Sequence, residues 1–421
     1  MELESPEAAK RRGVEDDEAF RFGRPPENLP SINDAVPTRE TDFGTVRIEK
    51  LDLANKSERA RFLDSADALY EGDPNYIAPL KMHFMRFLDP KTNPAFEALD
   101  VQAFIALKDG KFAGRITAHY DRNYARYHET ETGFFGFFES INDRKVAHAL
   151  FSAATDWCRE RKCVEIFGPM NFTMSHQVGL LVQNFDRPPF IEETYNPRYY
   201  VELVESYGFA KAKDWLVWWI DIGAGMETEN RKRVARIAER IRKREGLTLK
   251  TIDLSKPEQE IKKLYELYLA CWQKNWSFVP LSEKEFSWLA QDLKNVAIPE
   301  MIMFVEVEGR TVGFSATLPN VNEKLPKNGR LFPFAWMKLL FGGIKKAKAA
   351  RLYTLGMLPE YRKRGLEALM FTETVLRGQK VGFMGGEIGM TLEDNTLINR
   401  SIESMDGHID RTYRIFGMRL Q

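Results

Sequence analysis

Apolar and polar residues alternate in short stretches from Val46 onward, interleaved with longer stretches whose apolar residues recur at helical spacing. The segment IKKLYELYLACWQKNW predicts an amphipathic helix, because its apolar residues fall three or four positions apart. The segment MIMFVEVEGRTVGFSATL predicts two strands joined by a tight turn around Gly309. This interleaving of strands and helices predicts an α/β or α+β fold class.

The same order of elements occurs twice along the chain. The turn LKDGKFAGRI around Gly110 recurs as VEGRTVGFSA around Gly309, and NPRYYVELVESYGF recurs as NTLINRSIESMDGH at the same separation. The segments NYIAPL and WSFVPL form a further pair at nearly that separation. Short turns can resemble each other by chance, but the agreement of order and spacing favours an internal duplication.

The duplication divides the chain into four predicted segments. Residues 1–44 combine charge and scattered prolines with few apolar residues, which predicts a disordered N-terminal tail. Residues 45–222 and 249–421 are the two repeated units. Residues 223–248 include the basic segment NRKRVARIAERIRKREG, which predicts a linker helix. Its charges are either simply solvated or face an anionic surface.

Composition limits the classes of function. The length of 421 residues fits two hydrophobic cores, and a formal net charge of zero gives no reason to expect a nucleic-acid partner. Three cysteines without metal-ligand spacing suit a reducing compartment. There is neither an apolar signal core nor a stretch of about 18 apolar residues. We therefore expect a cytoplasmic protein, with peripheral contact at the inner membrane surface left open.

The segment PEYRKRGLEALMF predicts a strand that turns directly into a helix. The first N–H groups of such a helix lack intrahelical partners, and the positive end of the helix dipole points into the turn. Arg362, Lys363 and Arg364 add positive charge, and Gly365 allows a phosphate to approach the backbone. The turn therefore predicts an anion site, although a helix start that binds nothing is the plainer alternative.

This turn, the hairpin from Gly309 to Gly313 and the segment from Asn395 to Gly407 together resemble the GNAT-type N-acyltransferases. The resemblance covers the second unit, and the first unit is similar in layout. It implies two tandem GNAT-like units, each a mixed central sheet flanked by helices, and acyl-coenzyme A (acyl-CoA) as co-substrate without a metal. The cofactor residues that it implies are Leu355, Met357, Arg362, Lys363, Arg364, Gly365, Leu366 and Asn395.

Two features depart from the family pattern. Glu367 stands where the family prefers a small residue, and we expect its carboxylate to point outward, away from a bound phosphate. The corresponding helix of the first unit, in FESINDRKVAHALFSAA, has neither the glycine nor the basic triplet. We expect the first unit to be degenerate, holding coenzyme A poorly and serving either for packing or to shape the acceptor pocket.

Acyl transfer to an amine requires a base for the amine and an acid for the leaving thiolate. Glu387 and Glu393, on a predicted strand, are the candidate bases, since a partly desolvated carboxylate can have a raised pKa. Each is alternatively an ordinary surface carboxylate. The family often uses a tyrosine as acid, but the matching position is Ile402, so Tyr353 is the substitute candidate.

The sequence gives the weakest indication of where the acceptor binds. His176, Gln177 and Tyr195 fall in a predicted loop of the first unit, which is either an acceptor-binding lid or a packed turn. The insert LFPFAWMKLLFGGIKKAKAAR groups Trp336 with other apolar residues ahead of a basic run. Such a segment either caps the sheet or lies at a membrane interface.

Several functions are compatible with these patterns. An apolar wall beside the cofactor strand favours a long acyl chain or a lipid amine, such as a sphingoid-type acceptor in a ceramide-synthase-like reaction. A small polar amine is the simpler acceptor. A catalytically silent acyl-CoA-binding or ligand-binding module and an aminoacyl-tRNA-dependent transferase are the alternatives of other classes.

Overall fold

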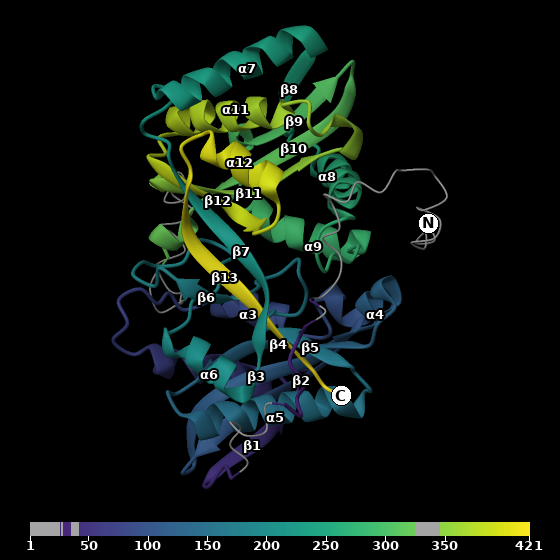
Figure 1. Ribbon diagram of the computed structural model, residues 1–421, viewed down its shortest axis with the longest axis vertical. Coiled ribbons are helices and arrows are strands. Elements are labelled where there is room, and N and C mark those ends of the chain that lie inside the picture. The colour runs from purple at the N-terminus through teal and green to yellow at the C-terminus, as the bar shows by residue number, and fades with distance from the viewer. Residues whose placement is uncertain (1–25, 27, 35–41, 326–345) are drawn as a thin grey trace.

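The computed structural model describes residues 26, 28–34, 42–325 and 346–421 (Figure 1). Most of the predicted tail and most of the apolar insert, including Trp336, lie outside the described residues. Within the predicted tail, Leu29 and Ile32 are buried, and Ile32 N–H donates to the Arg419 carbonyl (2.7 Å). The prediction of a disordered tail is therefore wrong for residues 28–34.

The described strands form one sheet of thirteen. The first half contributes β1 (Val46–Leu51), β2 (Leu99–Lys108), β3 (Lys111–Asp121), β4 (Thr132–Ser140), β5 (Glu165–Gly168), β6 (Leu180–Gln183) and β7 (Ala210–Asp221). The second half contributes β8 (Leu247–Thr251), β9 (Ile302–Val307), β10 (Arg310–Pro319), β11 (Ala349–Met357), β12 (Gly385–Leu392) and β13 (His408–Arg419). The sheet mixes parallel and antiparallel pairs, which confirms the predicted fold class.

Helices pack against this sheet in both halves (Figure 1). Those of the first half are α2 (Lys56–Asp64), α3 (Lys81–Phe87), α4 (Arg122–His128), α5 (Arg144–Glu160) and α6 (Tyr199–Tyr207). Those of the second half are α7 (Glu229–Glu245), α8 (Pro257–Trp272), α9 (Glu283–Lys294), α11 (Leu366–Val381) and α12 (Thr396–Glu403). Short 3-10 turns are η3 (Ala66–Tyr70), η4 (Pro94–Glu97), η5 (Pro299–Met301), η6 (Val321–Glu323) and η9 (Pro359–Tyr361).

The ends and buried faces of the helices follow from the local sequence. Asp143 caps α5 by accepting hydrogen bonds from the N–H groups of Lys145 and Val146. The basic helix α7 begins at the Thr228 cap and ends at Gly246, whose φ of 59° suits a glycine. Val234 and Ile241 of α7 are buried, so this predicted linker helix packs one face on the second half.

The last strand of each half is exchanged with the other half. Strand β7 pairs antiparallel with β12, from Asp221 opposite Gly385 to Trp215 opposite Leu392. Strand β13 pairs with β5, where Met418 lies opposite Ile166, and also with β7 along most of its length. Figure 1 shows the yellow β13 running from the upper half into the lower half beside the teal β7. The two sequence units are therefore interlocked in space.

Burial on the exchanged strands is extensive. Val217, Trp218, Tyr413, Ile415 and Phe416 are each at most 2% exposed. At about 1.5–3 kcal/mol for each buried large apolar side chain, this set contributes on the order of 10 kcal/mol, comparable to the net stability of a domain. Arg414 and Asp214, which lie opposite each other on the two strands, add an ion pair at 2.8 Å.

We expect neither half to fold alone. A fragment of residues 1–222 would lack β13 beside β5, and a fragment of residues 223–421 would lack β7 beside β12. Each fragment should show no cooperative thermal unfolding in near-UV circular dichroism, whereas the two fragments refolded together should regain it. Cooperative unfolding of either isolated fragment would contradict this account of the exchange.

Candidate functional site

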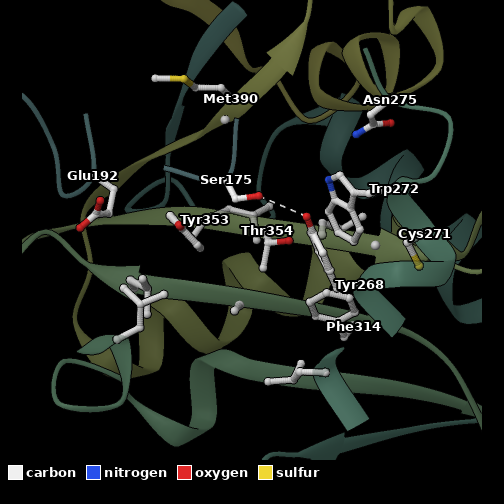
Figure 2. Close-up of a pocket in the computed structure, with 18 of the residues that line it drawn as sticks. Ser175, Glu192, Tyr268, Cys271, Trp272, Asn275, Phe314, Tyr353, Thr354 and Met390 are labelled. Atoms are coloured by element: carbon white, nitrogen blue, oxygen red, sulfur yellow. Dashed lines mark hydrogen bonds between the residues drawn. The ribbon is translucent and has the colours of Figure 1, made fainter. Parts of the chain in front are cut away.

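A cavity of about 460 Å³ opens where β11 and β12 diverge in the second half. The two strands pair in parallel only from Ala349 to Leu352 of β11 and Gly385 to Ile388 of β12. Beyond these residues the strands separate. Figure 2 shows Tyr353 and Thr354 of β11 near Tyr268 and Trp272 of α8 in this cavity. Further apolar lining comes from Leu264, Phe286, Leu289, Leu293, Ala297 and Phe314.

Several predicted cofactor residues surround this cavity. Its lining includes Leu355, Met357, Arg362 and Asn395. Asn395 also caps α12, where its side chain accepts from Ile398 N–H at 3.5 Å. Tyr353, the candidate acid, lies in the same wall, and burial raises its pKa to about 12, so that it stays protonated at neutral pH.

The basic turn leads into α11 as predicted. Gly365 is the N-cap residue of α11 with a φ of 80°, and as a glycine it has no side chain with which to cap the helix. Lys363 has a φ of 60°, and the Arg364 guanidinium lies 5.0 Å from the centre of the Tyr361 ring. Leu366 is buried in the core, which leaves its backbone as the part able to face a ligand.

Arg362 has a structural contact that the sequence did not reveal. Its Nε donates to the Met357 carbonyl at 3.1 Å, and its Nη2 donates to the Cys271 carbonyl at 2.5 Å. The guanidinium therefore ties the turn to β11 and α8. Burial raises the pKa of the Cys271 thiol to about 12, which makes it unsuitable as a nucleophile at neutral pH.

Glu367 does not point outward. It is only 9% exposed and lines the cavity, and its negative charge acts on Arg362. The expectation was wrong because the helix start faces the cavity, so that the side chain at this position turns inward with it. The predicted anion site therefore has a carboxylate beside its positive charges.

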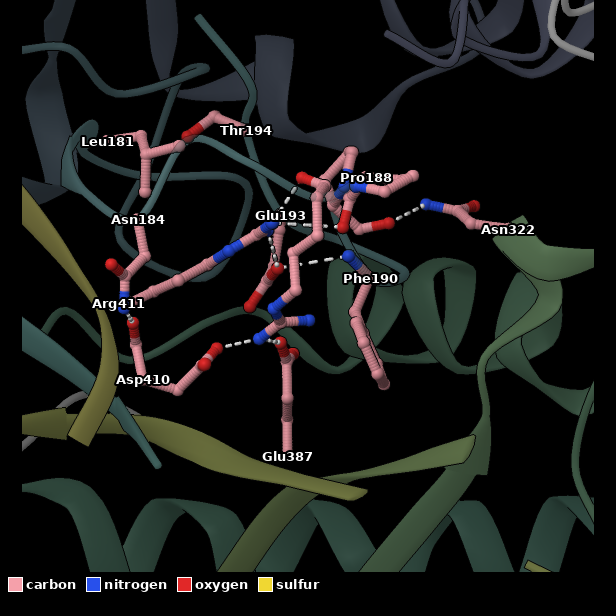
Figure 3. Close-up of polar contacts among 12 residues, drawn as sticks. Leu181, Asn184, Pro188, Phe190, Glu193, Thr194, Asn322, Glu387, Asp410 and Arg411 are labelled. Atoms are coloured by element: carbon pink, nitrogen blue, oxygen red, sulfur yellow. Dashed lines mark hydrogen bonds and ion pairs between the residues drawn. The ribbon is translucent and has the colours of Figure 1, made fainter. Parts of the chain in front are cut away.

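Glu387 lies in a buried cluster of charged side chains between the halves (Figure 3). Its Oε1 accepts a hydrogen bond from Arg187 Nη2 at 2.5 Å, and Arg187 forms an ion pair with Asp410. Glu193 pairs with Arg411 at 3.3 Å, and its negative charge acts on Glu387. Burial and the charge of Glu193 raise the pKa of Glu387 to about 8, so Glu387 is mostly protonated at neutral pH.

The two predicted bases are not brought to the cavity. Neither Glu387 nor Glu393 is among the described residues that line it. Glu393 forms an ion pair with Lys211 at 2.6 Å and accepts from Asp214 N–H at 3.0 Å, at the end of β12. Neither carboxylate thus has a position that favours direct proton transfer from a substrate in the cavity.

The predicted acceptor residues divide between two cavities. His176 lines the main cavity, and burial lowers its pKa to about 3, so that its ring is neutral. Gln177 and Tyr195 line a second cavity of about 270 Å³, whose walls come mostly from the first half and partly from the second. Tyr195 donates its hydroxyl to Asp73 at 2.8 Å, and Gln177 accepts from Asn171 at 3.1 Å.

The matching opening of the first half is partly filled by its own chain. Strands β4 and β5 pair from Thr132 to Phe134 and then diverge. Met170 N–H donates to the Phe135 carbonyl, and Phe137 N–H donates to the side chain of Asn171, both at 2.8 Å. A Cβ at Gly136 would lie 1.8 Å from the Met170 carbonyl oxygen. This opening therefore has no room for a pantetheine arm between the strands.

Comparison with known proteins agrees with this architecture. No protein-family model matches the chain. The chain is 35% identical over 385 residues to a protein of Caulobacter vibrioides named bacterial ceramide synthase, covering 89% of this chain and 98% of the relative. The chain belongs to the family of this bacterial ceramide synthase. Protein YghO of Escherichia coli is 31% identical over 370 residues, covering 86% of this chain and 93% of that protein.

A solved structure supports the tandem GNAT fold of this member of the bacterial ceramide synthase family. A tandem GNAT protein from the clavulanic acid biosynthesis pathway is similar with a TM-score of 0.53. The identity is 11%, and the match covers 89% of this chain and 98% of that one. This likeness confirms the predicted fold of two GNAT-like units. Together with the family assignment, this fold supports an N-acyltransferase.

The sequence analysis did not predict some of the residues that line the main cavity of this member of the bacterial ceramide synthase family. Tyr268, Trp272 and Asn275 lie on or just after α8, and Glu192 comes from the first half. The aromatic residues of α8 were a usable signal, because they recur on one helical face. The position of Glu192 depends on tertiary structure and had no local signal.

No group of three or more His, Cys, Asp or Glu residues among the described residues could hold a metal ion. No helix in the described ranges has the length and apolar composition needed to cross a membrane.

We expect Glu387→Gln to change how stability depends on pH. Glu387 has a folded-state pKa of about 8 and an ordinary value of 4.5. Between these values the folded state keeps a proton that the unfolded state has lost, so unfolding free energy falls as pH rises. The loss reaches at most about 1.4 kcal/mol per pH unit.

The variant should therefore resemble the wild type near pH 5 and become progressively more stable than it toward pH 8. Thermal unfolding across that range measures the difference. Glu202→Gln, on the exposed side of α6, is the control for introducing an amide. The assignment of the proton to Glu387 would be contradicted if the difference in stability between Glu387→Gln and the wild type stayed constant with pH.

Proposed function

We propose that this protein transfers a long acyl chain from acyl-CoA to the amine of a sphingoid-type lipid. The observation that carries the proposal is the apolar cavity at the divergence of β11 and β12. The apolar lining of this cavity continues along α8 and α9. The similarity to a protein named bacterial ceramide synthase supports the same substrate class.

The donor would lie between the diverging strands. Beyond Leu352, β11 remains paired with β10 but not with β12. Its open edge around Leu355 is suited to hydrogen bonding with the pantetheine arm, whereas the Met357 carbonyl already accepts from Arg362. The start of α11, whose N-cap residue is the glycine Gly365, would hold the pyrophosphate. Lys363 and Arg364 would supply positive charge there, while Arg362 positions the turn through its two carbonyl contacts.

The acyl chain would extend along α8 and α9. Leu264, Phe286 and Leu289 line this side of the cavity. Transfer of apolar surface from water to such a wall contributes about 0.8 kcal/mol for each buried methylene. A long-chain donor thus gains binding free energy that an acetyl donor cannot obtain, which favours long chains over acetyl groups.

Tyr353 is suited to the role of the acid. Its hydroxyl stays protonated at neutral pH, because burial raises its pKa to about 12. It can therefore donate a hydrogen bond to a developing oxyanion or a proton to a departing thiolate. Ile402, at the position where the family often has tyrosine, is fully buried in the core and leaves that role open.

The test is an assay of amide formation with donors of increasing chain length. The purified protein is given acetyl-CoA, octanoyl-CoA and palmitoyl-CoA with a sphingoid base or with a small polar amine. We expect the N-acyl sphingoid product to form fastest with the long donor, as measured by mass spectrometry and thiol release. Binding of acyl-CoA without amide formation would instead indicate a silent binding module.

A variant tests whether the acyl chain lies in this cavity. Ala290 of α9 lines the cavity, and Ala290→Trp should fill part of it and shift the preference toward shorter donors. Ala54→Trp, at an exposed position of the first half, is the matched control and should keep the wild-type preference. An unchanged preference in Ala290→Trp would show that the acyl chain lies elsewhere.

A further inference from the structure

Glu192 of the first half reaches the main cavity of the second half. It lines both the main cavity and the smaller second cavity, and with Leu293 it forms part of the wall between them. Figure 2 shows Glu192 on the same side of the main cavity as Tyr353. The negative charge of Glu192 also acts on the Tyr353 hydroxyl. A carboxylate therefore lies beside the region where the donor thioester would be held.

The residues on both sides of Glu192 are held by buried arginines. The Ile191 carbonyl accepts from Arg351 Nη1 at 2.5 Å, and the Glu193 carboxylate pairs with Arg411 at 3.3 Å. Phe190 N–H donates to the same Glu193 carboxylate at 3.0 Å. The loop is thus fixed immediately before and after Glu192, which holds the side chain in a defined place, as a catalytic group requires.

The backbone at Glu192 is in an unfavourable conformation. Its φ is 60°, in the left-handed region that residues other than glycine, asparagine and aspartate seldom adopt. Such conformations persist where the surrounding structure enforces them, and they cluster at functional sites. The contacts of Arg351 and Arg411 are the enforcing interactions here.

The second cavity is lined by several carboxylates, which suits the entry of a cation. Its lining includes the carboxylates of Asp64, Asp67, Glu139, Glu192 and Glu193. Arg115 and Lys81 also lie in this lining, and they are already paired with Glu139 (3.4 Å) and Asp64. An ammonium group is favoured in such surroundings, and Glu192 is the carboxylate of this set that also faces the main cavity.

We propose that Glu192 is the general base for the acceptor amine, which meets the thioester at the wall shared by the two cavities. This inference rests on the proposed acyl transfer. It assigns the base to the degenerate half, although the donor is held by the other half. The geometry favours Glu192 over Glu387 and Glu393, because it alone of the three is among the described lining residues of the main cavity.

The proton balance follows from the reaction. The acceptor arrives as an ammonium ion, and Glu192 accepts one proton from its nitrogen and later releases it to solvent. The neutral nitrogen attacks the thioester carbonyl carbon, and the C–S bond breaks as the tetrahedral intermediate collapses. The second proton of the nitrogen goes to the departing thiolate, for which the Tyr353 hydroxyl is the nearby relay. The products are an amide, the free thiol of coenzyme A and one released proton.

The first test is the rate of Glu192→Gln with palmitoyl-CoA and a sphingoid base. We expect kcat to fall about 100-fold or more, as for the loss of a general base, with KM for the donor unchanged. Its rate should then rise with pH through pH 9, because only amine that is already neutral reacts. Glu192→Asp should retain part of the wild-type rate, and Glu202→Gln on exposed α6 should retain all of it.

A second variant separates catalysis from structure. Asparagine tolerates the left-handed region better than glutamate, so Glu192→Asn should unfold at the wild-type Tm or above it while losing activity like Glu192→Gln. A lowered Tm with a rate that falls in proportion would indicate a structural role and overturn the inference.

The outcomes also separate this inference from the proposed function. A wild-type protein that acylates the sphingoid base, with Glu192→Gln equally fast from pH 6 to pH 9, would remove Glu192 as the base and leave the function standing. A wild-type protein that acylates no long-chain amine would overturn both.

Discussion

The pairing of β7 with β13 is the constraint on which the rest of the molecule depends. Each strand follows its own half in sequence but completes the sheet of the other half, so β12 and β5 both need a strand from across the molecule. The buried side chains of the two strands supply stabilisation comparable to the net stability of a domain. The halves therefore cannot move apart without loss of both cores, and a site built from both halves keeps its geometry.

The charged cluster and the loop around Glu192 follow from that exchange. Arg411 is carried by β13 and Arg351 by β11, and both contact the first-half loop beside Glu192. Without β13 next to β7, Arg411 would not reach Glu193. The exchange thus places a first-half carboxylate at a second-half cavity and holds it there. The duplicated units differ, because one has a cavity where its strands diverge and the other fills the matching opening with Met170 and Asn171.

Local patterns in the sequence were sufficient to predict the fold class, the duplication and the turn at Arg362–Gly365. Each of these features depends on residues that are close together in the chain. Strand exchange has no such signal, because alternation in β7 and β13 identifies a strand but not its partner. The positions of the Arg362 and Glu367 side chains could not be predicted, because they depend on which side of the helix start faces the cavity. Glu387 fits the general expectation of a buried carboxylate with a raised pKa, but its neighbours come from distant segments and place it in an ion-pair cluster.

The central claim is that the second half holds the donor while the first half supplies the acceptor side. A crystal structure with a non-reactive thioether analogue of palmitoyl-CoA tests this most directly. The account predicts the pantetheine arm between β11 and β12, the pyrophosphate at the start of α11, the alkyl chain along α8 and α9, and Glu192 facing the sulfur. An analogue bound between β4 and β5, or bound with Glu192 turned away from the sulfur, would contradict it.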